Sequence, residues 1–241
     1  MQHDPGLILA IAAVFFVAGL VKGVIGLGLP TVAMGLLGLF LPPAEGAALM
    51  ILPSLLTNFF QAATGGEAPR LLRKIWPLLL GLPLGAALGV WIGIGMASGG
   101  NLRLAQQGLG LALVLYGLFG LAERRLALPA RGAGLIGAAC GLVTGALTAA
   151  TGVFVLPAVP WLQALGLERR ALLQAMGLSF SVSTLALAES LGAGGDWGAS
   201  ALALVPTLLG MALGQRLNLP PVLFRRLFFC ALLALGAHLL W

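Results

Sequence analysis

One lysine interrupts an apolar run that glycines also break. Residues 19–30 read GLVKGVIGLGLP, and Lys22 is the only charged residue between Asp4 and Glu45. If this run lies in a membrane, the ammonium costs at least about 2.5–3.5 kcal/mol, so it indicates a wet pocket and a negative partner. The alternative is that the Lys22 side chain reaches along its apolar stem to the membrane interface.

The same stretch offers backbone donors to a ligand. Gly23, Gly26 and Gly28 allow backbone angles and close approaches that other residues do not. A helix beginning near Thr31 would present its free N–H groups and its partial positive charge to whatever lies at the break. This chemistry favours an anion.

A second stretch repeats the pattern. Residues 141–152 read GLVTGALTAATG, a second break, and a further half-helix is expected from about Val153. Amide and hydroxyl side chains on the helix after each break, including Thr184, could complete an anion site between the two breaks, although small hydroxyl residues are also common packing contacts between membrane helices. The predicted substrate-binding residues are Lys22, Gly23, Gly26, Gly28, Asn58, Gln61, Thr144, Gly145, Thr148, Thr151, Gln174 and Ser181.

The elements that position these residues are transmembrane helices. The chain has 241 residues, of which 60% are hydrophobic and only 8% charged, against roughly 25% charged in soluble domains. Several nearly uncharged runs approach the roughly 20 residues that a membrane-spanning helix needs. No ten-residue segments alternate polar and apolar residues, as a transmembrane barrel would require. We therefore expect an all-α integral membrane protein.

The sequence contains an internal repeat. GLVKG at 19–23 recurs as GLVTG at 141–145, and LGAALG at 84–89 recurs as LGMALG at 209–214. We expect one transmembrane domain over residues 1–241, with internal repeats at about 7–122 and 133–241.

Each repeat is expected to open with a broken helix. The pieces of the second break, 133–143 and 153–165, would each be about 16–20 Å long, too short to cross a bilayer alone. We therefore predict that each opening pair forms a re-entrant or broken-helix hairpin without net crossing, followed by three full spans. The opening pieces in the first repeat are 7–22 and 31–41. The six predicted spans are 46–65, 76–97, 104–122, 171–190, 199–215 and 225–241. Three spans per half is an odd number, so the second half is inverted relative to the first, as in many secondary transporters.

Charge placement favours this topology. With the loops at 66–74 and 123–131 in the cytoplasm, eleven of the thirteen basic residues fall inside, as the positive-inside rule expects. The basic residues lie in short clusters between apolar spans, which excludes a nucleic-acid-binding surface. We expect a multi-pass protein of the cytoplasmic (inner) membrane.

These motifs resemble one family. The paired openings GLVKGVIGLGLP and GLVTGALTAATG, together with LPLGAALG and LLGMALG, are similar to the sulfite exporter TauE/SafE family, also called the toluene sulfonate uptake permeases. The resemblance implies a polytopic carrier of small anions, among them sulfite, sulfonates, sulfur-containing acids and some carboxylates. Members often carry a Gly-Gly-Pro cluster in the second break, where this chain has residues 149–152, AATG.

The expected function is secondary transport of a small anion, with sulfite, an organosulfonate or a related sulfur-containing acid as the substrate. A passive anion channel and a carrier of small carboxylates remain alternatives, as does either direction of transport. An enzyme is not expected, because His3 and His238 are the only histidines and no H-E-x-x-H or G-x-S-x-G string occurs. No cofactor or metal is expected. The expected partners are the lipid bilayer, a coupling proton or sodium ion, and a second copy in a homodimer.

Overall fold

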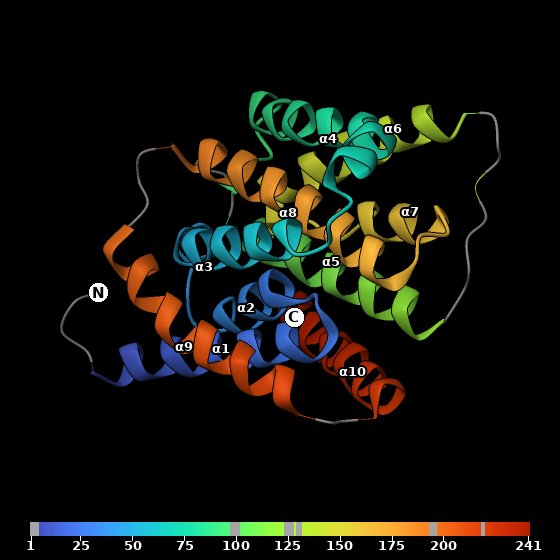
Figure 1. Ribbon diagram of the computed structural model, residues 1–241. Helices are drawn as coiled ribbons and strands as arrows, with labels where there is room; N and C mark the ends of the chain where they lie inside the picture. The colour runs from blue at the N-terminus through green and yellow to red at the C-terminus, as the bar shows by residue number, and fades with distance from the viewer. Residues whose placement is uncertain (1–4, 97–101, 123–127, 129–131, 193–196, 218–219) are drawn as a thin grey trace.

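The protein is an all-α integral membrane protein. The computed structural model describes residues 5–96, 102–122, 128, 132–192, 197–217 and 220–241, and these contain ten helices and no strand (Figure 1). Eight of the helices are long and apolar enough to cross a membrane. They are α1 (Pro5–Ile25), α3 (Pro43–Ala63), α4 (Ala68–Trp91), α5 (Leu102–Leu121), α6 (Ala133–Thr151), α8 (Arg169–Leu191), α9 (Trp197–Arg216) and α10 (Pro221–Leu240). The two short helices are α2 (Leu29–Leu37) and α7 (Ala158–Ala164).

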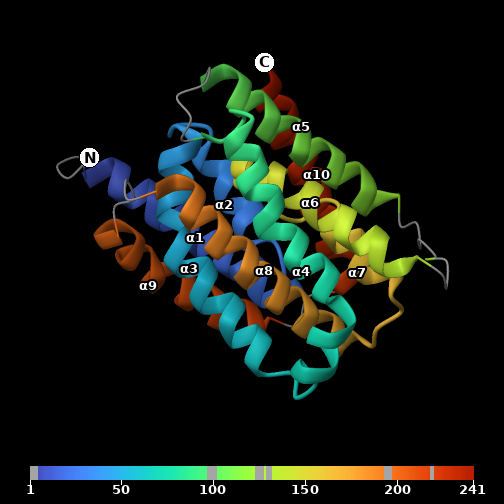
Figure 2. The same ribbon diagram turned by 90° about the horizontal axis from the view of Figure 1, so that it is seen from above.

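Helices α3 and α8 form the centre of the molecule. They are the most buried of the eight long helices. They run antiparallel, since Gln61 near the end of α3 bonds to Leu173 near the start of α8. Figure 2 shows α4 packed beside α8, and α6 packed against α4.

Two further pairs of helices pack in parallel through glycines. A Cβ on Gly19 or Gly23 of α1 would collide with the backbone of α9 at Thr207 or at Met211–Gln215. In the same way, Gly141 and Gly145 of α6 lie against the α4 backbone. The glycines of GLVKG and GLVTG therefore both allow close packing against a neighbouring helix. Under the predicted correspondence of the two repeats, α1 corresponds to α6 and α9 corresponds to α4, so the pair α1–α9 is equivalent to the pair α6–α4.

The direction of the helices accounts for the first hairpin. Ser200, in the first turn of α9, bonds to the backbone of Leu49 and Leu52 in the first half of α3, so α3 and α9 begin on the same side. Because α1 runs parallel to α9, α1 and α3 both begin on that side. The chain between them, which includes α2, must therefore return, and the α1–α2 pair makes no net crossing. This observation supports the inverted arrangement, which stays a prediction.

The first limb of each hairpin is longer than expected. α1 has 21 residues and α6 has 19, so they are about 32 and 28 Å long, enough to cross alone. The expectation that these limbs are half-helices is wrong. Only the second limbs, α2 with nine residues and α7 with seven, are short.

The six later spans agree with the bounds predicted from the sequence to within a few residues, except for α4. This helix begins at Ala68 rather than at residue 76, because Pro69 suits the first turn of a helix and the basic residues Arg70, Arg73 and Lys74 point outward from its first two turns. Most of the expected loop at 66–74 is therefore helical. The basic cluster at 123–131 and Asp196 lie outside the described residues, apart from Leu128.

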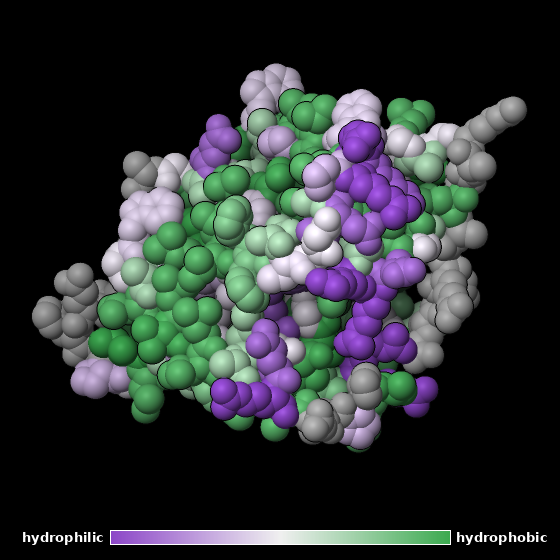
Figure 3. Space-filling view, viewed as in Figure 1, coloured by the Kyte–Doolittle hydropathy of each residue, from purple (hydrophilic) through white to green (hydrophobic). Residues whose placement is uncertain are grey.

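The surface divides by polarity. In Figure 3 apolar residues cover the left-hand part of the face, and hydrophilic residues gather to the right, where α4 and α8 begin. Large apolar side chains such as Leu9, Phe59 and Leu202 are exposed on several long helices. A surface of this kind suits contact with lipid chains, with the polar side in the headgroup region.

Candidate functional site

The first break lies between α1 and α2. Gly26 and Gly28 have φ values of 77° and 102°, in the left-handed region that favours glycine. Pro30 follows in the first turn of α2, where its missing N–H costs nothing. A break is present between the predicted pieces 7–22 and 31–41, but it covers only residues 26–28, because α1 continues to Ile25 and α2 begins at Leu29.

Lys22 lies in the last turn of α1, beside this break. Its side chain is only 4% exposed, so it does not reach the membrane interface. Its ammonium donates a hydrogen bond to Asn58 Oδ1 on α3. Asn58 Nδ2 in turn lies 3.5 Å from Thr184 Oγ1 on α8, which it faces as a weak donor. The sequence-predicted Lys22 and Asn58 therefore meet, and they connect three helices.

The buried ammonium has no carboxylate partner among the described residues. The ion pair between Arg70 and Glu67 lies on the surface. The carbonyl-rich end of α1 and Asn58 Oδ1 stabilise the cation in part. A lone buried charge is costly unless a counter-charge accompanies it. A bound anion would therefore stabilise the Lys22 ammonium.

The second break lies later in the chain than predicted. Residues 144–151 are helical, and α6 ends at Thr151 before Gly152, with φ 70°. Thr148 and Thr151 donate their hydroxyls to the carbonyls of Thr144 and Leu147, four residues earlier, so their polar groups are satisfied within the helix. The half-helix expected from Val153 begins instead at Ala158.

Two of the predicted glycines serve packing. Gly23 and Gly145 lie inside α1 and α6, without left-handed backbone. A Cβ on Gly145 would stand 2.7 Å from Ala86 N of α4. These glycines allow two helix backbones to touch, as small residues commonly do in membranes.

The other two predicted amide side chains, those of Gln61 and Gln174, form hydrogen bonds with backbone groups. Gln61 Nε2 donates to Leu173 O at 2.7 Å, and Gln174 Nε2 donates to Ala62 O at 2.7 Å. Gln174 Oε1 accepts from Glu67 N at 2.9 Å. Both glutamines join the end of α3 to the start of α8. Ser181 donates to Gly177 O within α8 and is half-buried.

Three buried hydroxyls were not predicted as site residues. Thr31 Oγ1, Ser54 Oγ and Ser183 Oγ are buried without a hydrogen-bond partner among the described residues. Thr31 stands in the first turn of α2, and Ser54 lies one turn before Asn58 on α3. Ser183 is next to Thr184 on α8. Thr31 could have been chosen from its place after the break; serines within a membrane helix carry no such signal.

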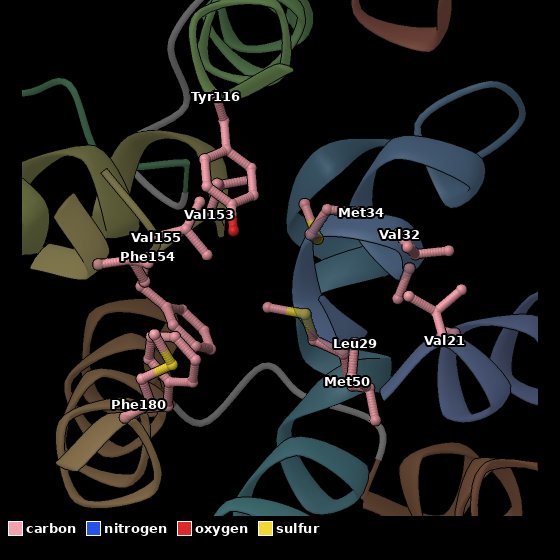
Figure 4. Close-up of a cluster of buried hydrophobic side chains, with 14 of the residues drawn as sticks. Val21, Leu29, Val32, Met34, Met50, Tyr116, Val153, Phe154, Val155 and Phe180 are labelled. Atoms are coloured by element: carbon pink, nitrogen blue, oxygen red, sulfur yellow. The ribbon is translucent and has the colours of Figure 1, made fainter. Parts of the chain in front are cut away.

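The two breaks touch through apolar side chains. Gly152 lies against Met34 of α2, and a Cβ there would stand 2.9 Å from Met34 Cε. Figure 4 shows Val153 to Val155 on one side and Leu29 to Met34 on the other, with the Tyr116 hydroxyl pointing between them. The breaks therefore meet, with an apolar contact between them.

The fold and the site define a polytopic helical membrane protein with a buried cation beside a broken helix. The family model of the sulfite exporter TauE/SafE matches residues 11–239 of the 241, so the chain belongs to this family of membrane transporters. Membership implies transport of sulfite or a related anion, in agreement with the expectation that the protein is not an enzyme. Searches of curated proteins and of solved structures find no match.

Proposed function

We propose that the protein is a secondary transporter of the cytoplasmic membrane that binds one small anion at the first break. The substrate is sulfite, an organosulfonate or a related sulfur-containing acid. The observation that carries this proposal is the buried Lys22 ammonium, which bonds to Asn58 and has no carboxylate partner among the described residues.

The anion would lie between the last turn of α1 and the first turn of α2. Only three residues separate these helices, and a Cβ added to Gly28 would stand 3.2 Å from Val21 Cγ1 of α1. The ammonium, the Thr31 hydroxyl and the free N–H groups at the start of α2 would be the donors. Asn58 positions the ammonium.

Transport requires the site to open to each side in turn. Two inverted halves supply two packings of similar energy that can exchange by rocking. The Met34–Gly152 contact joins the two breaks, and its apolar character suits a barrier that separates in one step of the cycle. A proton or sodium ion would drive the cycle, and small-residue stripes would allow a homodimer.

The test is transport by the purified protein in vesicles. Sulfite, thiosulfate, sulfonates, small carboxylates and chloride would be compared for the wild type and Lys22→Met. Lys74→Met is a matched control, because Lys74 is the only other lysine and is exposed on α4. We expect Lys22→Met to lose at least about 90% of the transport rate, since one charge-assisted bond is worth roughly 1.5–3 kcal/mol.

Three results would count against the proposal. A folded Lys22→Met variant that transports every anion at the wild-type rate would remove Lys22 from the site. A chloride flux that does not saturate with concentration would favour the passive channel. Saturable transport of small carboxylates alone would favour the carboxylate carrier.

A further inference from the structure

Lys22 is the only buried cation that the structure describes. Ten of the thirteen lysines and arginines fall within the described residues, and the other nine are exposed. The described elements packed against α1 and α2 carry their other ionisable side chains near their ends or on exposed faces, apart from the buried phenol of Tyr116. Those side chains are Glu45, Arg103, Glu189, Arg169, Arg170, Arg216, Arg225, Arg226, Cys230 and His238. The site thus offers one positive charge.

Two backbone donors of the second break are already occupied. Val153 N donates to Thr151 Oγ1 at 3.2 Å, and Ala158 N, in the first turn of α7, donates to Thr144 Oγ1 at 3.1 Å. The protein's own hydroxyls therefore take up N–H groups that an anion would otherwise use. This break adds little to anion binding.

The first break lacks such self-capping. Gly28 caps α2 without a side chain, and no side-chain hydrogen bond is present at that cap. Thr31 in the same turn is fully buried, and its hydroxyl has no partner among the described residues. The start of α2 thus carries an unpartnered hydroxyl, and a break of three residues separates it from the last turn of α1, which holds the Lys22 ammonium. Such a combination suits an anion.

We infer that this site selects anions carrying a single negative charge, such as hydrogensulfite and sulfonates, and rejects dianions such as sulfate and fully ionised sulfite. The inference rests on the proposed function. A monoanion neutralises Lys22 and accepts from Thr31 and the α2 backbone. A dianion leaves one charge uncompensated in a buried site, which is costly.

The experiment is competition against radiolabelled sulfite transport in vesicles that contain the wild-type protein. Methanesulfonate is a permanent monoanion, and sulfate is a dianion of similar size. We expect methanesulfonate to inhibit at concentrations at least about tenfold lower than sulfate, which corresponds to about 1.4 kcal/mol of selectivity. Sulfate competing as well as methanesulfonate, or neither anion competing, would overturn the inference.

A variant tests the donor set. Thr31→Val removes the hydroxyl and keeps the shape, and we expect it to weaken methanesulfonate competition by about fivefold to tenfold, the worth of one hydrogen bond. Thr207→Val is the control, because Thr207 is also fully buried but its hydroxyl bonds to Ala203 O in its own helix. Equal competition in both variants would remove Thr31 from the site.

The outcomes separate the two proposals. A wild-type protein that transports sulfite and depends on Lys22, but is inhibited by sulfate as strongly as by methanesulfonate, refutes only the charge selection. A wild-type protein that transports none of the anions refutes the proposed function, and the charge selection with it.

Discussion

At the scale of residues, Lys22 and Asn58 form a unit whose members depend on each other. Asn58 Oδ1 is the one acceptor for the ammonium among the described side chains. Removing it leaves a buried charge without a partner, whereas replacing both by apolar residues of similar size leaves none.

We therefore predict that Asn58→Leu lowers the free energy of unfolding by roughly 2–4 kcal/mol, and that Lys22→Met in the same chain restores part of the loss. The measurement is thermal unfolding of the single and double variants in detergent. The double variant is expected to fold and not to transport. Additive losses of stability would mean that the two side chains are not coupled.

The same residues show what the sequence can reveal. An isolated charge among glycines is a rare pattern, so Lys22 and the break at Gly26 and Gly28 could be predicted. The end of α6 could not be. Thr148 and Thr151 satisfy their hydroxyls within the helix, and Gly145 is held helical by contact with α4. The contact of Gly145 with α4 is tertiary and leaves no local pattern in the sequence.

At the scale of elements, glycine contacts join α6 to α4. Gly145 has the α4 backbone where a Cβ would be, but a Cβ on Gly134 of the same helix would make only an ordinary van der Waals contact, with Pro77 Cγ 3.7 Å away. The two glycines share a helix and differ in their neighbours.

We predict opposite effects for the two substitutions. Gly145→Ala forces α6 away from α4 and should cost roughly 1–3 kcal/mol or more. Gly134→Ala should be neutral or stabilise by up to about 1 kcal/mol, because alanine favours the helix. Chemical unfolding in detergent measures both. A Gly145→Ala protein as stable as the wild type would show that the two backbones do not touch.

At the scale of the whole molecule, the central pair explains how the halves could be inverted. α3 and α8 run antiparallel and contact each other, while α1 and α6 each lie parallel to a helix of the opposite half. Each half thus completes the packing of the other. The sequence predicts that GLVKG and GLVTG correspond, but it could not predict their packing partners, since a repeat shows which positions correspond and not which positions touch.

Inverted halves predict which residues share a side of the membrane. Glu45 begins α3 and Glu189 ends α8, so single cysteines at these exposed positions should both react with an impermeant maleimide added outside cells. Thr64 and Glu168, at the opposite ends of the same two helices, should react only after permeabilisation, because the basic side faces the cytoplasm. Cys140 and Cys230 would first be replaced by serine, and each variant would be checked for transport.

Labelling of the cysteines at positions 45 and 189 from opposite sides would contradict the antiparallel α3–α8 pair as a membrane arrangement. Labelling of all four positions from outside would mean that the helices do not span the bilayer. The expected pattern would place the start of α2 and Lys22 nearer the cytoplasmic side, since α1 runs parallel to α9 and ends beside Gln215.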